Sequence, residues 1–217
     1  MRFRLSLVVA GTIAASAGCA RSPKVPPSTS AATTSPTPLA SLAGQRIVVL
    51  PLHYLRATDT LGLSSTISKP KEFLRSLDDE IAFAFGERGL SKQWVFPADL
   101  ARSQRRNVGH SIDPYTLAAE VLRPTGPRRI PQLPDPLATQ LRSLVALSEA
   151  RYALFPVELR FENSGGAGRA VLHVALLDAR LANVRWAGEI LGDTMRTLSP
   201  GVAASLANRL ANLITAP

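Results

Sequence analysis

The strongest constraint on the fold lies in the last third of the sequence, where three apolar segments follow one another with short connections. Residues 157–162 alternate apolar and charged side chains, which predicts a β-strand with one face in water. Residues 165–168 (Gly-Gly-Ala-Gly) predict a turn, and residues 170–177 return as a strongly apolar strand. Residues 184–190 predict a third strand. Three strands joined in this way form an antiparallel meander.

Before the meander, the sequence predicts a βα unit. The continuous apolar run of residues 46–52 suits a strand that is covered on both faces. Residues 70–89 predict an amphipathic helix, because a large apolar residue recurs every fourth position from Phe73 to Phe85. Residues 94–97 are a plausible second short strand, which ends at its proline.

The remaining segments are helices and one loop. Residues 99–106 and 114–122 predict two short helices, residues 124–136 a proline-rich loop, and residues 137–148 a regular helix. A C-terminal helix follows residue 199. The sequence therefore predicts an α/β (α+β) fold, in which a single mixed sheet ends in the three-strand antiparallel meander and helices pack on that sheet.

The first 18 residues have the features of a secretory signal peptide. Arg2 and Arg4 precede an uncharged apolar run over residues 5–15, and small residues follow it. The run is shorter than the roughly 20 apolar residues that a membrane span needs. We therefore predict that residues 1–18 are a signal peptide and are removed on export.

Cys19 follows the signal directly and is the only cysteine of the chain. Ala17-Gly18-Cys19 resembles the bacterial lipobox, in which the cysteine sulfur takes a diacylglyceryl group and the freed amine takes a further acyl chain such as palmitate. The resemblance implies a lipoprotein anchored through Cys19, and Ala20 implies the outer membrane with the protein facing the periplasm. Cleavage after Ala17 is the alternative, and it would release a soluble periplasmic protein.

A tether separates the anchor from the folded part. Residues 19–44 consist largely of Ser, Thr, Pro and Ala and contain no aromatic residue. Such a segment buries too little apolar surface to offset the entropy lost on ordering. We predict a tether over residues 19–44 and a single α/β envelope domain over residues 45–217.

The order of the elements behind a lipoprotein signal resembles a known group of envelope domains. Residues 46–52 (RIVVLPL) are similar to an opening strand that ends in Pro, and residues 149–190 are similar to a strand followed by a hairpin whose tip reads D-x-x-x-x-x-V-x-W. Both resemble the amino-terminal part of TolB, the curli-secretion lipoprotein CsgG and the penicillin-binding-protein activator LpoB. The resemblance implies an accessory lipoprotein. The long amphipathic membrane hairpins of a secretion pore have no counterpart in the sequence.

The sequence offers no catalytic constellation. His53, His110 and His173 are far apart and fit no metal-ligand spacing, and no nucleophile elbow or phosphate-binding loop is present. His173 is predicted to be a hydrogen-bonded histidine in the core or on the sheet face. Residues 78–80 (Asp-Asp-Glu) predict a solvated acidic face, because adjacent helix positions point in different directions. We therefore predict no catalytic residue, no metal and no cofactor.

Charge gives the one candidate binding surface. Without Arg2 and Arg4, the chain has 23 Lys and Arg side chains and 16 Asp and Glu side chains, which gives a net charge of +7. Export argues against nucleic acid as the partner of this charge. Guanidinium groups in the middle segment suit carboxylates or phosphates of a partner protein, anionic lipid or cell wall. The candidates are Arg102, Arg105, Arg106, Arg128 and Arg129. The alternative is an arginine-rich solvated surface without a ligand.

Two functions are compatible with these features. The first is a non-enzymatic envelope lipoprotein that binds another envelope protein as an accessory or assembly factor. The second is a ligand-binding receptor or an envelope hydrolase on a similar fold. The chemistry of any cleft distinguishes them, because an enzyme needs converging polar groups with perturbed pKa values.

Overall fold

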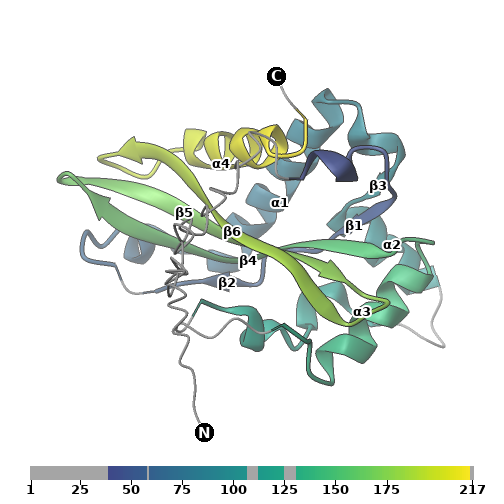
Figure 1. The fold of residues 1–217 in the computed structure, drawn as a ribbon. Helices are drawn as coiled ribbons and strands as arrows, with labels where there is room; N and C mark the ends of the chain where they lie inside the picture. The colour runs from purple at the N-terminus through teal and green to yellow at the C-terminus, as the bar shows by residue number, and fades with distance from the viewer. Residues whose placement is uncertain (1–38, 58, 107–111, 125–130, 216–217) are drawn as a thin grey trace, which may run out of the picture. The chain divides into compact units, whose positions relative to one another are not determined.

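The computed structural model of the chain describes residues 39–57, 59–106, 112–124 and 131–215. The predicted signal peptide, Cys19, the tether up to residue 38, His110, Arg128 and Arg129 lie outside these residues. The described residues form a six-stranded mixed sheet in the order β3-β1-β4-β5-β6, and β2 pairs with β4 (Figure 1). The strands are β1 (Ile47–Val49), β2 (Tyr54–Leu55), β3 (Trp94–Val95), β4 (Tyr152–Ser164), β5 (Ala167–Asp178) and β6 (Asn183–Met195).

The two halves of the sheet differ in strand direction. β1 lies between β3 and β4 and runs parallel to both, and β2 is parallel to β4. β4, β5 and β6 form the predicted antiparallel meander. Gly165 and Gly166 form the turn between β4 and β5 with φ angles of +64° and +83°, which glycine adopts without the strain of a side chain. The predicted fold class is confirmed.

Helices cover both faces of the sheet (Figure 1). The helices are α1 (Pro70–Glu87), α2 (Pro97–Arg106), α3 (Leu137–Ala146) and α4 (Gly201–Asn212). α1 and α4 pack on each other, and their apolar side chains share one core with Leu154 and Leu172 of the sheet. α2 and α3 contribute to a second core on the opposite face with Phe155 and Leu177. The sheet therefore separates two hydrophobic cores.

One predicted helix is replaced by shorter turns. Residues 114–122 form two separate 3₁₀ turns, η5 (Pro114–Thr116) and η6 (Ala119–Leu122), instead of a continuous helix. Leu117, between them, has an extended backbone with ψ 149°. The Asp113 side chain accepts a hydrogen bond from the Tyr115 N–H and thereby fixes a tight turn at the start of the segment.

Regular alternation predicts that Val157 lies on the same face of the sheet as Leu159 and Phe161, and this prediction is wrong. Val157 belongs to the core under α2 and α3, whereas Leu159 and Phe161 belong to the core under α1 and α4. The register of β4 against β5 shifts between Pro156 and Glu158, which marks a β-bulge. Because a bulge places one extra residue on a strand, it reverses the alternation of faces beyond that point.

The folded part includes residues that the sequence assigns to the tether. Residues 40–42 form the 3₁₀ turn η1 (Ala40–Leu42), and Leu39 and Leu42 are buried in the core under α1 and α4. The Leu39 N–H donates to the carbonyl of Leu213 at 3.0 Å. Two leucines thus attach the segment just before Gln45 to the domain.

Candidate functional site

The chain changes faces between β1 and β3. These strands are parallel neighbours, yet the chain continues from β1 through β2 to α1 on one face of the sheet, whereas β3 leads directly to α2 on the other. The segments that follow the two strands therefore diverge. In open α/β sheets, this divergence leaves a crevice in which ligands bind.

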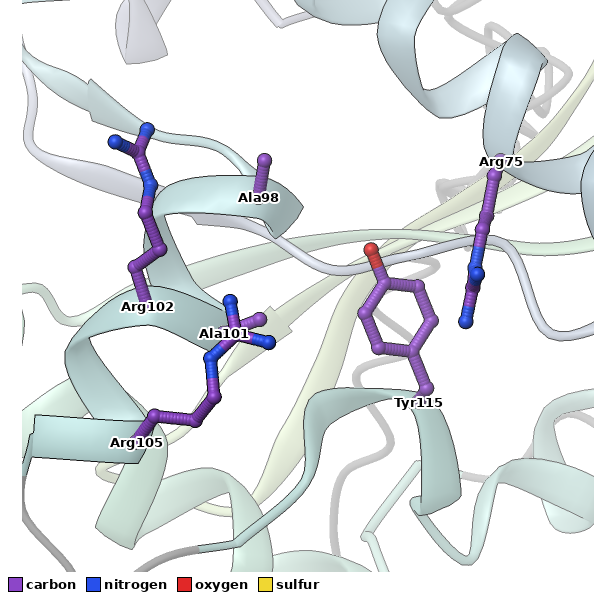
Figure 2. Close-up of a pocket in the computed structure, with 6 residues that line it drawn as sticks. All are labelled: Arg75, Ala98, Ala101, Arg102, Arg105 and Tyr115. Atoms are coloured by element: carbon purple, nitrogen blue, oxygen red, sulfur yellow. The ribbon is translucent and has the colours of Figure 1, made fainter.

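A surface pocket with a volume of about 400 Å³ lies among the elements that follow these two strands (Figure 2). α1, α2 and η5 line it with Arg75, Ala98, Ala101, Arg102, Arg105 and Tyr115, and we call it the arginine pocket. Tyr115 lies between Arg75 and the two arginines of α2 (Figure 2). The pocket therefore combines three cationic side chains, one phenol and no acidic lining residue.

The local sequence explains why α2 presents these arginines. Leu100 and Gln104 are spaced by one helical turn and are both buried, so they fix the inner face of the helix. Arg102 and Arg105 fall on the outer, exposed side. Pro97 suits the first helical turn because its missing N–H needs no partner there.

The three arginines differ in their contacts. Arg102 forms an ion pair with Asp99, one turn earlier in α2. The Arg75 guanidinium lies 5.4 Å from the centre of the Tyr115 ring, within the range of a cation–π contact. Arg105 has no ion-pair or hydrogen-bond partner within the described part of the chain. Among the three arginines, Arg105 is therefore the one whose guanidinium is best placed to bind an external anion.

Tyr115 and Asp78 give the pocket its titratable groups. Burial, with the nearby Asp78 carboxyl, raises the pKa of Tyr115 although Arg75 opposes the change, so its hydroxyl stays protonated and can donate a hydrogen bond. Asp78 is 5% exposed, and its Oδ1 accepts the Leu52 N–H at 2.9 Å. Its Oδ2 has no partner among the described residues. Burial raises the pKa of Asp78 to about 7. The prediction that Asp78 is solvated is wrong, because Asp78, like the adjacent Leu77, lies on the buried side of α1.

The structure assembles part of the predicted arginine surface. Arg102 and Arg105 line the pocket, whereas Arg106 is exposed on α2 and is not among the lining residues. Arg128 and Arg129 lie outside the described residues. Sequence reasoning missed Arg75 and Tyr115. The available signal for Arg75 was its place on the helix that follows the first parallel strand.

A second group of charges lies on the sheet face and is self-contained. The Glu158 side chain is 0% exposed, and Arg56 donates to both of its oxygens at 3.0 and 2.8 Å. Arg123 donates to Glu158 at 2.7 Å and to Glu120 at 2.9 Å, and it lies 4.9 Å from the ring centre of Tyr54. Burial raises the pKa of Glu158, but the two guanidiniums outweigh burial and hold it below its usual value. We call these five residues the Glu158 cluster.

The described histidines form no catalytic arrangement. The His53 ring nitrogen Nδ1 lies 2.8 Å from the Pro51 carbonyl, and burial lowers the pKa of His53. His173 is half-buried opposite Glu158 on the sheet, and its Nδ1 has no hydrogen-bond partner among the described residues, in contrast to the prediction of a hydrogen-bonded histidine. Across the described ranges, no group of three or more His, Cys, Asp and Glu residues could hold a metal ion. No helix in those ranges is both long and apolar enough to cross a membrane.

Comparisons with known proteins give distant structural neighbours. No protein family matches the sequence, and no curated protein matches it. PelC from Paraburkholderia phytofirmans, solved as a dodecamer, is 15% identical with a TM-score of 0.38, over 81% of this chain and 91% of PelC. LpoB from E. coli is 13% identical with a TM-score of 0.36, over 73% of this chain and 66% of LpoB. A lipoprotein from Neisseria meningitidis is 15% identical with a TM-score of 0.34, over 77% and 96% of the two chains.

These neighbours agree in part with the resemblance found in the sequence. LpoB, one of the three proteins that the resemblance names, is among them, and another neighbour is a lipoprotein. At these TM-scores the likeness transfers no function to this chain. The function proposed below therefore rests on the site and on the sequence.

Proposed function

We propose that this protein is a non-enzymatic lipoprotein of the bacterial envelope that binds another envelope protein, and that the arginine pocket receives an acidic side chain of that partner. The observation that carries the proposal is the guanidinium of Arg105, which has no partner among the described residues and lines the same pocket as Arg75 and Tyr115. A guanidinium can hold a carboxylate through two parallel hydrogen bonds. The Tyr115 hydroxyl supplies a further donor.

The exposure of the pocket favours a protein partner over an enclosed small molecule. Arg75, Ala98, Arg102 and Arg105 are all exposed. Small-molecule sites instead bury most of the ligand among apolar side chains. Arginine is enriched at protein interfaces, where its long stem packs and its head pairs with acidic groups. A protruding Asp or Glu of a partner fits this open, cationic pocket.

The proposed location rests on the sequence. Cys19 follows the signal peptide, and acylation there would place the domain at the outer membrane, facing the periplasm. We expect Cys19→Ser to abolish labelling by a fatty-acid analogue and to leave an unlipidated precursor. If the wild-type protein is unlabelled and begins at Gly18, the alternative cleavage after Ala17 is correct and the protein is soluble and periplasmic.

Photocrosslinking in the native membrane tests the docking site. A photoreactive residue in place of Ala98, which lines the pocket, should capture one defined envelope protein. The double variant Arg75→Gln and Arg105→Gln should reduce this capture at least about 10-fold, because each charged hydrogen bond contributes about 1.5–3 kcal/mol. Arg142→Gln removes an exposed arginine of α3 and serves as the matched control. Equal capture by the double variant and the control would exclude the pocket as the docking site.

One observation favours a second candidate, a receptor for a small anion or a hydrolase. Asp78, with a pKa of about 7, lies close enough to Arg75 and Tyr115 to affect the pKa of Tyr115. Perturbed titratable groups beside a pocket mark many catalytic sites. Native mass spectrometry of the purified protein distinguishes the candidates. A bound small anion that Arg105→Gln releases would favour the receptor or hydrolase.

A further inference from the structure

Within the part of the chain that the structure describes, the outer edge of β6 is open along its middle. β6 is the last strand of the sheet, and both ends of its outer side have partners. The Val184 N–H donates to Pro131 at 3.2 Å, and the Asp193 N–H donates to the Ser205 hydroxyl at 3.0 Å. From residue 185 to 192, no described residue outside β5 hydrogen-bonds to the backbone of β6. An open edge of this length is a template for another strand.

The middle of β6 has few of the devices that usually protect an edge, although its pairing with β5 shifts register at both ends, between Val184 and Trp186 and between Leu191 and Thr194. Residues 185–192 contain neither Pro nor Lys. One face carries the exposed Ala187, Glu189 and Leu191, of which Leu191 is 42% exposed. The opposite face is apolar. There the Trp186 ring lies over Gly188 so closely that a Cβ at Gly188 would come within 2.4 Å of it. Both faces therefore offer apolar contacts to an added strand.

We propose that β6 pairs antiparallel with β6 of a second copy of this chain, about a two-fold axis at Gly188 and perpendicular to the sheet. This symmetry places residues at equal distances from Gly188 opposite each other and keeps the two faces of the sheet in register. Ala187 faces Glu189 of the partner subunit. Trp186 faces Ile190 of the partner subunit on the apolar side. The two sheets become one continuous sheet.

The neighbouring registers are worse for reasons visible in β6. An axis at Glu189 would bring two glutamates directly opposite each other, which is destabilising. An axis at Ala187 would place residues 190 and 191 of the partner against Val184 and Asn183, where residues 131–133 already lie along the edge. With the axis at Gly188, every pair from residue 186 to 190 falls inside the open segment, where β6 is regularly paired with β5.

Two substitutions at one exposed position test this register. In Ala187→Lys, each copy gains a lysine opposite a glutamate, so we expect the dimer dissociation constant to fall about 10-fold. In Ala187→Glu, each copy gains a glutamate opposite a glutamate, so we expect the constant to rise about 10-fold. Both side chains point to solvent in the single copy, and a matched thermal melt verifies that folding is unchanged.

Sedimentation equilibrium of the full chain in a density-matched neutral detergent gives the dissociation constants. Phe83→Lys and Phe83→Glu, at a 63% exposed position of α1, make the same changes in net charge and should leave the dimer unaffected. A wild-type chain that stays monomeric up to about 1 mM, the weak end of specific association, would overturn the proposal. Equal effects of Ala187→Lys and Ala187→Glu would overturn it as well.

Discussion

Glu158 and Asp78 are both buried carboxyl groups, yet their protonation behaviour is opposite. Glu158 is completely buried and contacts two guanidiniums, and its pKa is held below the usual value. Asp78 is 5% exposed, accepts one backbone N–H, and has a pKa raised to about 7. The comparison shows that contact with a cation, and not burial alone, decides whether a buried carboxyl remains charged.

Asp78→Asn should give the largest effect, and it should depend on pH. Because the pKa of Asp78 is raised on folding from 3.8 to about 7, its favourable contribution is complete below pH 3.8 and is lost as the pH rises through 7. At about 1.4 kcal/mol per pKa unit, this loss is on the order of 4 kcal/mol. Denaturant unfolding of both proteins at several pH values should show the variant gaining stability over wild type from acid to pH 8. A constant difference across this range would contradict the raised pKa.

Glu158→Gln should destabilise the protein by about 3 kcal/mol at pH 7, because it leaves two guanidiniums without their buried partner. The sign of its pH dependence is opposite to that of Asp78. The pKa of Glu158 is lowered on folding, so its contribution is present above its ordinary pKa of 4.5 and is lost as the pH falls through the folded value. Urea unfolding should therefore show a difference from wild type that shrinks in acid. A loss below about 1 kcal/mol at pH 7 would show that the ion pairs contribute little.

Removing Arg123, one of the two cations that contact Glu158, tests how the pKa values of Glu158 and Asp78 come to differ. Arg123→Gln should cost about 1–2 kcal/mol, because it removes the contacts with Glu158, Glu120 and the Tyr54 ring. The bidentate contact of Arg56 with Glu158 remains. The pKa of Glu158, followed by NMR, should rise in the variant but stay well below that of Asp78. A Glu158 pKa near 7 would mean that Arg123 alone keeps the carboxylate charged.

The smallest effect should come from the arginine pocket. Arg105→Gln should change the free energy of unfolding by less than about 0.5 kcal/mol, since Arg105 is exposed and unpaired within the described residues. Thermal unfolding measures the change. A larger loss would place Arg105 among the structural ion pairs and would remove the main argument for the pocket as a docking site.

The meander could be predicted because its alternating side chains and glycine turn are local signals. The bulge at Val157 could not, since it depends on the pairing of β4 with β5 and not on the composition of β4. Trp186 packs against the core under α1 and α4, but its position on the edge strand leaves it only half-buried. The depth of burial depends on strand order, which local patterns do not contain.

The candidate site was predicted only where its residues share one segment. Arg102 and Arg105 are close in sequence, whereas Arg75 and Tyr115 reach the pocket from α1 and η5. Their convergence follows from the reversal of faces at β1 and β3. The buried position of Asp78 was missed for a similar reason, because the N–H that it binds belongs to Leu52 at the end of another element.

The attachment of Leu39 and Leu42 has a mechanical consequence. The hydrogen bond from the Leu39 N–H to the Leu213 carbonyl holds the segment before β1 beside the end of α4. In a protein held by a lipid at Cys19, tension along the chain would enter at this point. Two core leucines and this hydrogen bond would carry the load before any strand of the meander did. The attachment of Leu39 and Leu42 is therefore the part of the domain that should yield first under force.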